Sequence, residues 1–184
     1  MNHSEIFYGE LQLIQDKTLA ADVQRILNKL VPPYFYILAA SSTGKYHPWY
    51  SLGYGGLVRH TKAAVRIAYD LLQIEQYKHL NSDAIIAALI LHDTFKHGID
   101  CGPYTVANHP LVAAHEIITW VEKNLPEEQW PKFREICDLI ASHMGQWNMV
   151  NNQPLLPKPK TEAEKFVHLC DYLASRKYIV VEVQ

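Results

Sequence analysis

Cysteine, net charge and long apolar runs are all scarce in this sequence, and each shortage excludes a class of protein. The three cysteines are scattered and form no CxxC pair, so neither a disulfide framework nor a thiolate zinc site is expected. A formal net charge of −2 gives no strong signal for nucleic-acid binding. The longest apolar run, residues 84–91, is too short to span a bilayer. The N-terminus lacks the apolar segment of a signal peptide. We therefore expect a cytoplasmic protein with reduced thiols and no membrane partner.

Apolar residues are abundant, and their spacing is helical. They make up 48% of the chain, which is enough for a sizeable core. The periodicity predicts about six helices and no convincing sheet, with a candidate short strand at 179–183. The predicted helices cover residues 5–30, 57–77, 83–97, 110–124, 127–144 and 161–178. The expected class is all-α, a compact irregular bundle. We expect residues 1–55 to form an N-terminal helix and long loop packed on a helical domain spanning 56–184.

Capping residues and prolines indicate where these helices begin. Ser82 is expected to cap the third helix, and Pro110 suits the first turn of the fourth. Thr161 and Glu164 form the T-x-x-E pattern of a capping box before the last helix. Residues 32–56 are rich in proline, glycine, serine and tyrosine, so they are expected to form a long ordered loop. The length of that loop makes a functional role plausible.

Histidine is the residue that stands out, with ten in the chain. Four predicted helices place a histidine or aspartate where the periodicity demands an apolar residue, and His109 adds a fifth position before a proline. These residues are His60, His92 with Asp93, His143 and Asp171. A single such histidine is usually a core residue, but a buried carboxylate without a partner is costly. Several on converging faces favour a shared metal site. Imidazole and carboxylate ligands suit one or two ions of Fe, Mn, Co, Ni or Zn.

The ordered set His60, His92-Asp93, His143 and Asp171 resembles the HD superfamily of metal-dependent phosphohydrolases. Residues 87–96 resemble the family's signature helix, including a lysine three residues past the aspartate. Residues 108–110 resemble the His-Pro element of two-metal members such as the HD-GYP phosphodiesterases, and 169–174 resemble the closing aspartate helix. The chain departs from the HD-GYP pattern at 144–147, where Met-Gly-Gln-Trp stands instead of the GYP-type segment. The resemblance covers about two thirds of the chain.

This resemblance implies ligands, chemistry and substrate class. The first metal would be held by His60, His92, Asp93 and Asp171, and the second by Asp93 as a bridge with His109 and His143. The implied reaction is hydrolysis of a phosphomonoester or phosphodiester, of a nucleotide or related small molecule, by metal-activated water. Asp93 and Lys96 are the implied catalytic residues. Two alternatives stay open: a two-iron oxygenase of the HD fold, and a non-catalytic nucleotide-binding HD module.

Three basic residues are candidates for contacting the substrate phosphate: Lys96, Arg59 and Lys45. Lys96 lies one helical turn past Asp93, although a solvated surface lysine fits that spacing equally well. Arg59 neighbours a predicted ligand, and so does Arg176; each is a possible phosphate contact or a salt-bridge partner. Lys45 ends a Ser-Ser-Thr-Gly-Lys turn that lacks the full phosphate-loop pattern.

The remaining histidines are interpreted more simply. His115 faces an apolar stretch and is the rival of His109 as a ligand. His47, with Trp49 and Tyr50, is interpreted as packing its loop down, and His168 as structural or surface. The sequence leaves the substrate, the metal and the oligomeric state open.

Overall fold

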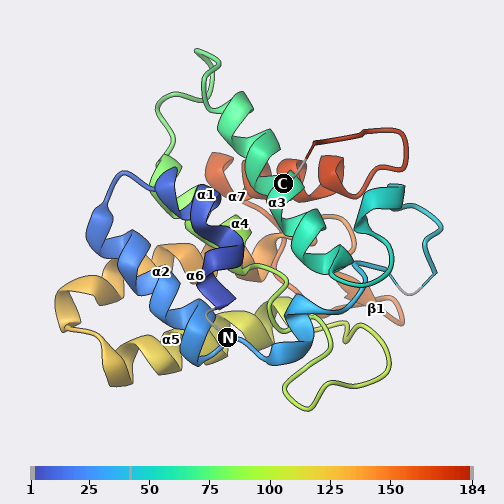
Figure 1. Ribbon diagram of the computed structural model, residues 1–184, viewed down its shortest axis with the longest axis horizontal. Helices are drawn as coiled ribbons and strands as arrows, with labels where there is room; N and C mark the ends of the chain where they lie inside the picture. The colour runs from blue at the N-terminus through green and yellow to red at the C-terminus, as the bar shows by residue number, and fades with distance from the viewer. Residues whose placement is uncertain (1–2, 42, 183–184) are drawn as a thin grey trace.

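Seven α-helices and four short 3-10 helices form the described part of the chain, residues 3–41 and 43–182 of a computed structural model (Figure 1). The α-helices are α1 (Tyr8–Gln12), α2 (Lys17–Lys29), α3 (Gly56–Leu71), α4 (Ser82–Leu91), α5 (His109–Asn124), α6 (Trp130–Ser142) and α7 (Glu162–Ala174). The 3-10 helices are η1 (His3–Phe7), η2 (Pro33–Tyr36), η3 (Trp49–Ser51) and η4 (Glu127–Gln129). Strand β1 (Met149–Val150) pairs antiparallel with β2 (Gln153–Pro154). The predicted all-α class is confirmed.

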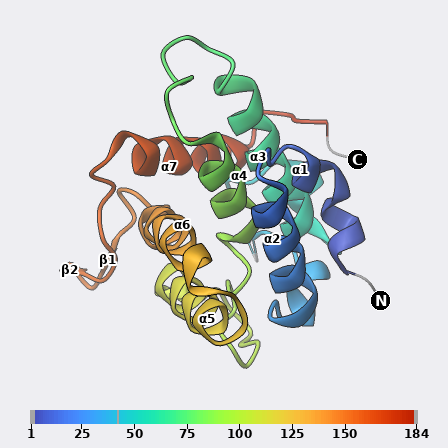
Figure 2. The ribbon, with the colours of Figure 1, turned by 90° about the vertical axis from the view of Figure 1, so that its left-hand side faces the viewer.

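Helix α4 is the centre of the bundle. It packs against α3, α6 and α7 (Figures 1 and 2), and every residue from 84 to 91 is buried. A helix that is apolar on all sides is stable only when other elements surround it, which explains why the longest apolar run lies here. In the described residues, no helix has both the length and the apolar character needed to cross a membrane.

The N-terminal elements share this core. Leu19, Val23 and Ile26 on one face of α2 are buried in the same apolar cluster as α4, and the rings of Phe7 and Phe35 stack with centroids 6.0 Å apart. Burial of these side chains holds η1, α2 and η2 against the helices that follow. The division of the chain at residue 55 stays a prediction.

The single helix predicted over residues 5–30 is wrong, because the chain breaks between α1 and α2. Asp16 caps α2: its carboxylate accepts hydrogen bonds from the backbone N–H groups of Thr18 and Leu19. The carboxylate of Asp83, just inside α4, accepts from the N–H groups of Gln15 and Asp16. These bonds satisfy backbone donors that a continuous helix would have used internally.

Other predicted boundaries are partly right. Thr161 and Glu164 form the predicted capping box of α7, and Pro110 lies in the first turn of α5. Asn81 caps α4 in place of Ser82, because its side chain accepts from the N–H of Ala84.

The predicted helix ends at 77, 97, 144 and 178 are too late, since the regular helices end at 71, 91, 142 and 174. The candidate strand at 179–183 is wrong for residues 179–182, which are irregular. Its last residue lies outside the described part.

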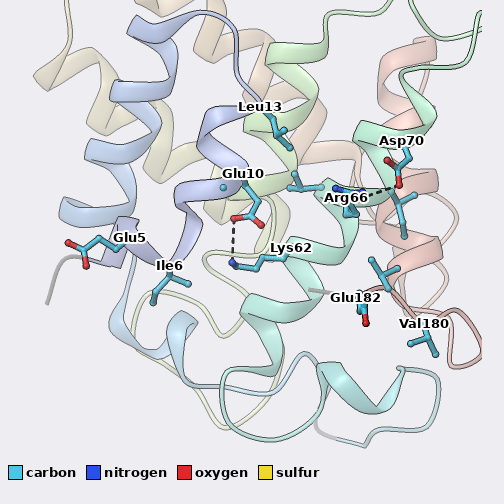
Figure 3. Close-up of a pocket in the computed structure, with 13 residues that line it drawn as sticks. Glu5, Ile6, Glu10, Leu13, Lys62, Arg66, Asp70, Val180 and Glu182 are labelled. Carbon is cyan, nitrogen blue, oxygen red and sulfur yellow. Dashed lines mark ion pairs between the residues drawn. The ribbon is translucent and has the colours of Figure 1, made fainter. Parts of the chain in front are cut away.

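A groove of about 1050 Å³ runs between the N-terminal helices, α3 and the C-terminal tail (Figure 3). Glu10 of α1 and Lys62 of α3 form an ion pair across it at 3.5 Å, and Arg66 pairs with Asp70 along α3 at 3.4 Å. None of the predicted metal ligands lines this groove, so the candidate site lies elsewhere.

Candidate metal centre

The six predicted ligands come together from five helices, mostly at the helix ends. His109 is the first residue of α5, and His92 and His143 are the C-terminal caps of α4 and α6. Asp93 follows in the turn after α4, and all four are at most 1% exposed. The other two lie within helices: His60 in α3, also 1% exposed, and the half-buried Asp171 in α7.

The end of α4 explains how the adjacent residues His92 and Asp93 both face one site. Neighbouring residues within an α-helix point about 100° apart. Regular helix stops at Leu91, and tighter three-residue turns follow, such as the hydrogen bond from the Lys96 N–H to the Asp93 carbonyl at 3.1 Å. The tighter winding turns both side chains toward the same interior point.

One group of ligand atoms surrounds the carboxylate of Asp171. Its Oδ1 lies 2.9 Å from His60 Nε2 and 3.5 Å from His92 Nε2. Asp93 Oδ2 lies 3.7 Å and 3.5 Å from the same two nitrogens. Two ligands each about 2.1 Å from one ion lie roughly 3.0–3.4 Å from each other, so these separations suit a shared ion.

A second group lies on the other side of Asp93. Its Oδ1 is 3.1 Å from His109 Nε2 and 3.8 Å from His143 Nε2, and the two nitrogens are 3.3 Å apart. The two carboxylate oxygens of Asp93 thus face two different sets of nitrogens. This is the placement that a carboxylate bridging two ions requires.

Backbone hydrogen bonds fix which ring nitrogen faces the site. The Nδ1 atoms of His92, His109 and His143 lie 2.7, 2.9 and 2.7 Å from the carbonyl oxygens of residues 89, 106 and 140. A carbonyl only accepts, so each Nδ1 carries a proton, and the Nε2 of each ring is the nitrogen that faces the site. The Nε2 atoms of His109 and His143 therefore face each other and Asp93 Oδ1. A metal ion held between them would bind all three atoms.

Buried polar atoms without partners support the same conclusion. His92 Nε2 and Asp93 Oδ1 are fully buried and have no hydrogen-bond partner among the described residues. Such atoms cost free energy unless something satisfies them. Two groups of possible ligand atoms lie close enough together to hold an ion. One group comes from His60, His92 and Asp171, and the other from His92, Asp93 and His143. The residues present therefore fit divalent transition metals.

The pKa shifts of Asp93 and His143 favour metal binding. Burial raises the pKa of the Asp93 carboxyl, but nearby Lys96 and His92 outweigh it and hold the pKa well below its usual value. Burial, with His92 nearby, lowers the pKa of His143 to about 3. Burial alone would lower the pKa of His92, but the carboxylates of Asp93 and Asp171 outweigh burial, so the net effect is a raised pKa. Ionised carboxylates and a neutral His143 are the forms that bind metal.

Comparison with known families agrees with this geometry. The family model described as HD domain matches residues 57–176, a span that contains all six residues. The chain belongs to the HD domain family. This superfamily comprises metal-dependent phosphohydrolases, so the predicted resemblance is confirmed. No curated protein and no solved structure matches the chain.

A cavity of about 410 Å³ opens on the candidate metal centre of this HD protein. His60 and Asp171 lie at the metal end of its lining, with Lys96 beside them. The ammonium of Lys96 also pairs with Asp93 Oδ2, and its side chain is only 12% exposed. Of the two interpretations of Lys96, the one that makes it a solvated surface residue is therefore wrong. The rest of the lining comes from two loops and from α7 and the turn after it: Tyr46, His47, Met144, Trp147, Tyr172, Ser175 and Arg176.

Two of the predicted phosphate contacts do not line this cavity. The guanidinium of Arg59 donates to the backbone carbonyls of Tyr50, Leu52 and Tyr54, so it holds the loop after η3 in place. The ammonium of Lys45 lies over the ring of Tyr46, 5.0 Å from its centroid, and Lys45 is not among the residues that line the cavity. Within its Ser-Ser-Thr-Gly-Lys turn, residue 42 lies outside the described part.

His109 and His115, the two alternative ligands, lie in different parts of the structure. His115 is exposed on α5 and lines a different, shallow pocket between α5 and α6, whereas His109 faces Asp93. His47 lines the metal-side cavity, and its buried Nδ1 has no hydrogen-bond partner in the described chain. The loop that carries His47 has no periodic pattern. Only the ability of histidine to bind metals or donate protons could have marked this residue in the sequence.

His168 ties the last helix to the metal centre. Its Nδ1 lies 2.7 Å from the backbone carbonyl of His143, to which it donates. The ring packs against Gly145, which has a φ of +57° and where a side chain would collide with the imidazole. The contact fixes the turn that carries His143 against α7, so His168 helps to position a predicted ligand.

Proposed function

We propose that this HD protein is a metal-dependent phosphohydrolase that cleaves a phosphomonoester or phosphodiester of a nucleotide or related small molecule. The observation that carries the proposal is Asp93, whose two oxygens face separate sets of imidazoles beside a cavity of substrate size. Divalent ions held by these residues would neutralise phosphate charge and lower the pKa of a bound water.

The chain's own residues divide the remaining work. Lys96 lines the cavity next to Asp93 and would donate to a phosphate oxygen as a charge-assisted contact. His60 and Asp171 line the same end, so a phosphate placed there touches both metal ligands and Lys96. Arg176 adds a second cation to the lining. A cavity that combines two cations with a metal centre favours an anionic substrate.

The test is phosphate release from a panel of nucleotides. Purified protein is stripped with chelator, supplied in turn with Mn, Co, Fe, Ni or Zn, and offered nucleoside mono-, di- and triphosphates and cyclic nucleotides. We expect metal-dependent release that Asp93→Asn reduces to background. His115→Ala is the matched control, because it removes a histidine from the same chain outside the site, and it should keep wild-type activity.

Two outcomes would contradict the proposal. If no metal supports phosphate release from any compound while iron-loaded protein consumes oxygen with a polyol or phosphonate, the oxygenase alternative replaces it. If nucleotides bind with no turnover under any condition, the protein is a binding module.

A further inference from the structure

The outer wall of the cavity, away from the metal centre, is built by Trp147, Tyr172 and Arg176. The rings of Trp147 and Tyr172 stack with centroids 5.6 Å apart and planes 16° from parallel. The Arg176 guanidinium lies 4.1 Å from the Tyr172 centroid and 6.0 Å from that of Trp147. All three residues line the cavity. None of them belongs to the set that faces Asp93.

Arg176 is an unpaired cation in this wall. Its Nε donates to the Tyr172 carbonyl at 3.1 Å, and its Nη2 donates to Ser175 Oγ at 2.7 Å. In the part of the chain that the structure describes, no carboxylate forms an ion pair with it, and its Nη1 has no partner. The salt-bridge interpretation of this residue is therefore wrong. A guanidinium held in place beside aromatic rings, with a free donor, suits a ligand that carries acceptor atoms.

Trp147 offers a flat surface next to that donor. Although it stacks on Tyr172, its side chain remains 46% exposed and lines the cavity. Exposed aromatic rings bind planar heterocycles by stacking, which is worth about 1–3 kcal/mol for a nucleobase. The cavity volume of about 410 Å³ falls within the range of about 300–1,000 Å³ that small-molecule sites occupy.

We propose that Trp147 and Arg176 select the part of the substrate remote from the scissile phosphate, and that this part is a nucleobase. The base stacks on Trp147, and Arg176 donates to carbonyl or ring-nitrogen acceptors on its edge. The guanidinium lies against the aromatic rings at the outer wall, whereas Lys96 contacts Asp93 at the opposite, phosphate side of the cavity. The inference rests on the proposed function for the position of the phosphate.

The test compares substrates that differ only in the base. kcat and KM are measured for the four ribonucleoside 5′-monophosphates and for ribose 5-phosphate, with the metal that supports turnover. We expect wild type to prefer at least one nucleotide over ribose 5-phosphate, mainly through KM. Trp147→Ala should remove most of that preference, by roughly 5- to 150-fold for a stacking loss of about 1–3 kcal/mol. Trp147→Phe should restore part of it.

Two further variants sharpen the comparison. Trp49 is 74% exposed and does not line the cavity, so Trp49→Ala is the matched control and should keep the wild-type preference. Arg176→Gln should change the ranking among the four bases. If it instead changes only the preference for mono- over triphosphates, Arg176 binds phosphate and its proposed role is overturned.

Calorimetric binding of the same monophosphates separates the two proposals. Trp147-dependent binding without phosphate release from any substrate would uphold base recognition and overturn the proposed hydrolysis. Equal kcat/KM for nucleotides and ribose 5-phosphate in wild type, unchanged in Trp147→Ala, would overturn base recognition and leave hydrolysis standing. Absence of both binding and turnover would overturn both.

Discussion

Replacing Lys96 with methionine removes the cation that balances the buried Asp93 carboxylate and keeps much of the apolar stem. The two side chains are only 12% and 2% exposed, and removing one partner of a buried ion pair costs about 3–5 kcal/mol. His60 and His92 also lie near the same carboxylate oxygen, at 3.7 and 3.5 Å. We therefore expect a loss near the lower end, about 3 kcal/mol, in chelator-treated protein. For a chain of this size that corresponds to roughly 6–12 °C in Tm.

Metal should reduce that loss. A divalent ion beside Asp93 supplies the positive charge that Lys96 otherwise provides, so Lys96→Met should be destabilised less with Mn or Co than with chelator. kcat/KM should fall tenfold or more, since a lost charge-assisted contact costs about 1.4 kcal/mol or more.

Urea denaturation with and without metal measures both stabilities. The control is Lys62→Met, which breaks a similarly buried pair with Glu10. Lys62 lines the other groove, which none of the predicted ligands lines, so its cost should not depend on metal. An equal loss for Lys96→Met in both conditions would show that bound metal does not replace the charge of Lys96 beside Asp93.

The remaining predictions concern pH, ligand assignment and capping. Because the pKa of His143 is about 3 in the folded protein, against an ordinary 6.5, chelator-treated protein should lose stability as pH falls from 6.5, by at most about 1.4 kcal/mol per pH unit. Urea denaturation at pH 7 and pH 5 should show a smaller loss in His143→Gln, and equal losses would contradict this. Elemental analysis should find less metal in His109→Ala and a wild-type amount in His115→Ala; the reverse result would exchange their roles. Thr161→Ala removes the cap of α7 and should cost about 1 kcal/mol, or about 2–4 °C in a thermal melt, and an unchanged Tm would show that the cap is dispensable.

Helical periodicity predicted that His60, His92, His143 and Asp171 face the core, whereas His109 was predicted from its position before a proline. His60 and Asp171 lie on the apolar stripes of their helices, and those stripes must face the core. His92 and His143 lie on stripes that run to the helix ends. The sequence could also predict the capping box of α7, because both bonding groups lie within four consecutive residues.

Helical periodicity could not predict features that depend on contacts with backbone far away in the sequence. Arg59 lies next to a predicted ligand, yet its donors are used by carbonyls of a loop whose path no pattern fixes. The break before α2 depends on Asp83, whose carboxylate accepts a hydrogen bond from the N–H of Asp16, 67 residues earlier in the chain. His47 and Trp147 line the cavity from irregular segments. In such segments the spacing of residues along the sequence does not predict where their side chains point.

Anomalous diffraction from crystals grown with Mn, Fe, Co, Ni or Zn would show how many metals the site binds and through which residues. We predict two anomalous peaks, one on each side of Asp93, each with nitrogen and oxygen ligands about 2.0–2.2 Å away. The ligands of the first peak should be His60, His92, Asp93 and Asp171, and those of the second Asp93, His109 and His143. A centre without anomalous signal for every one of these metals, or a metal bound by other residues such as His115, would contradict this prediction.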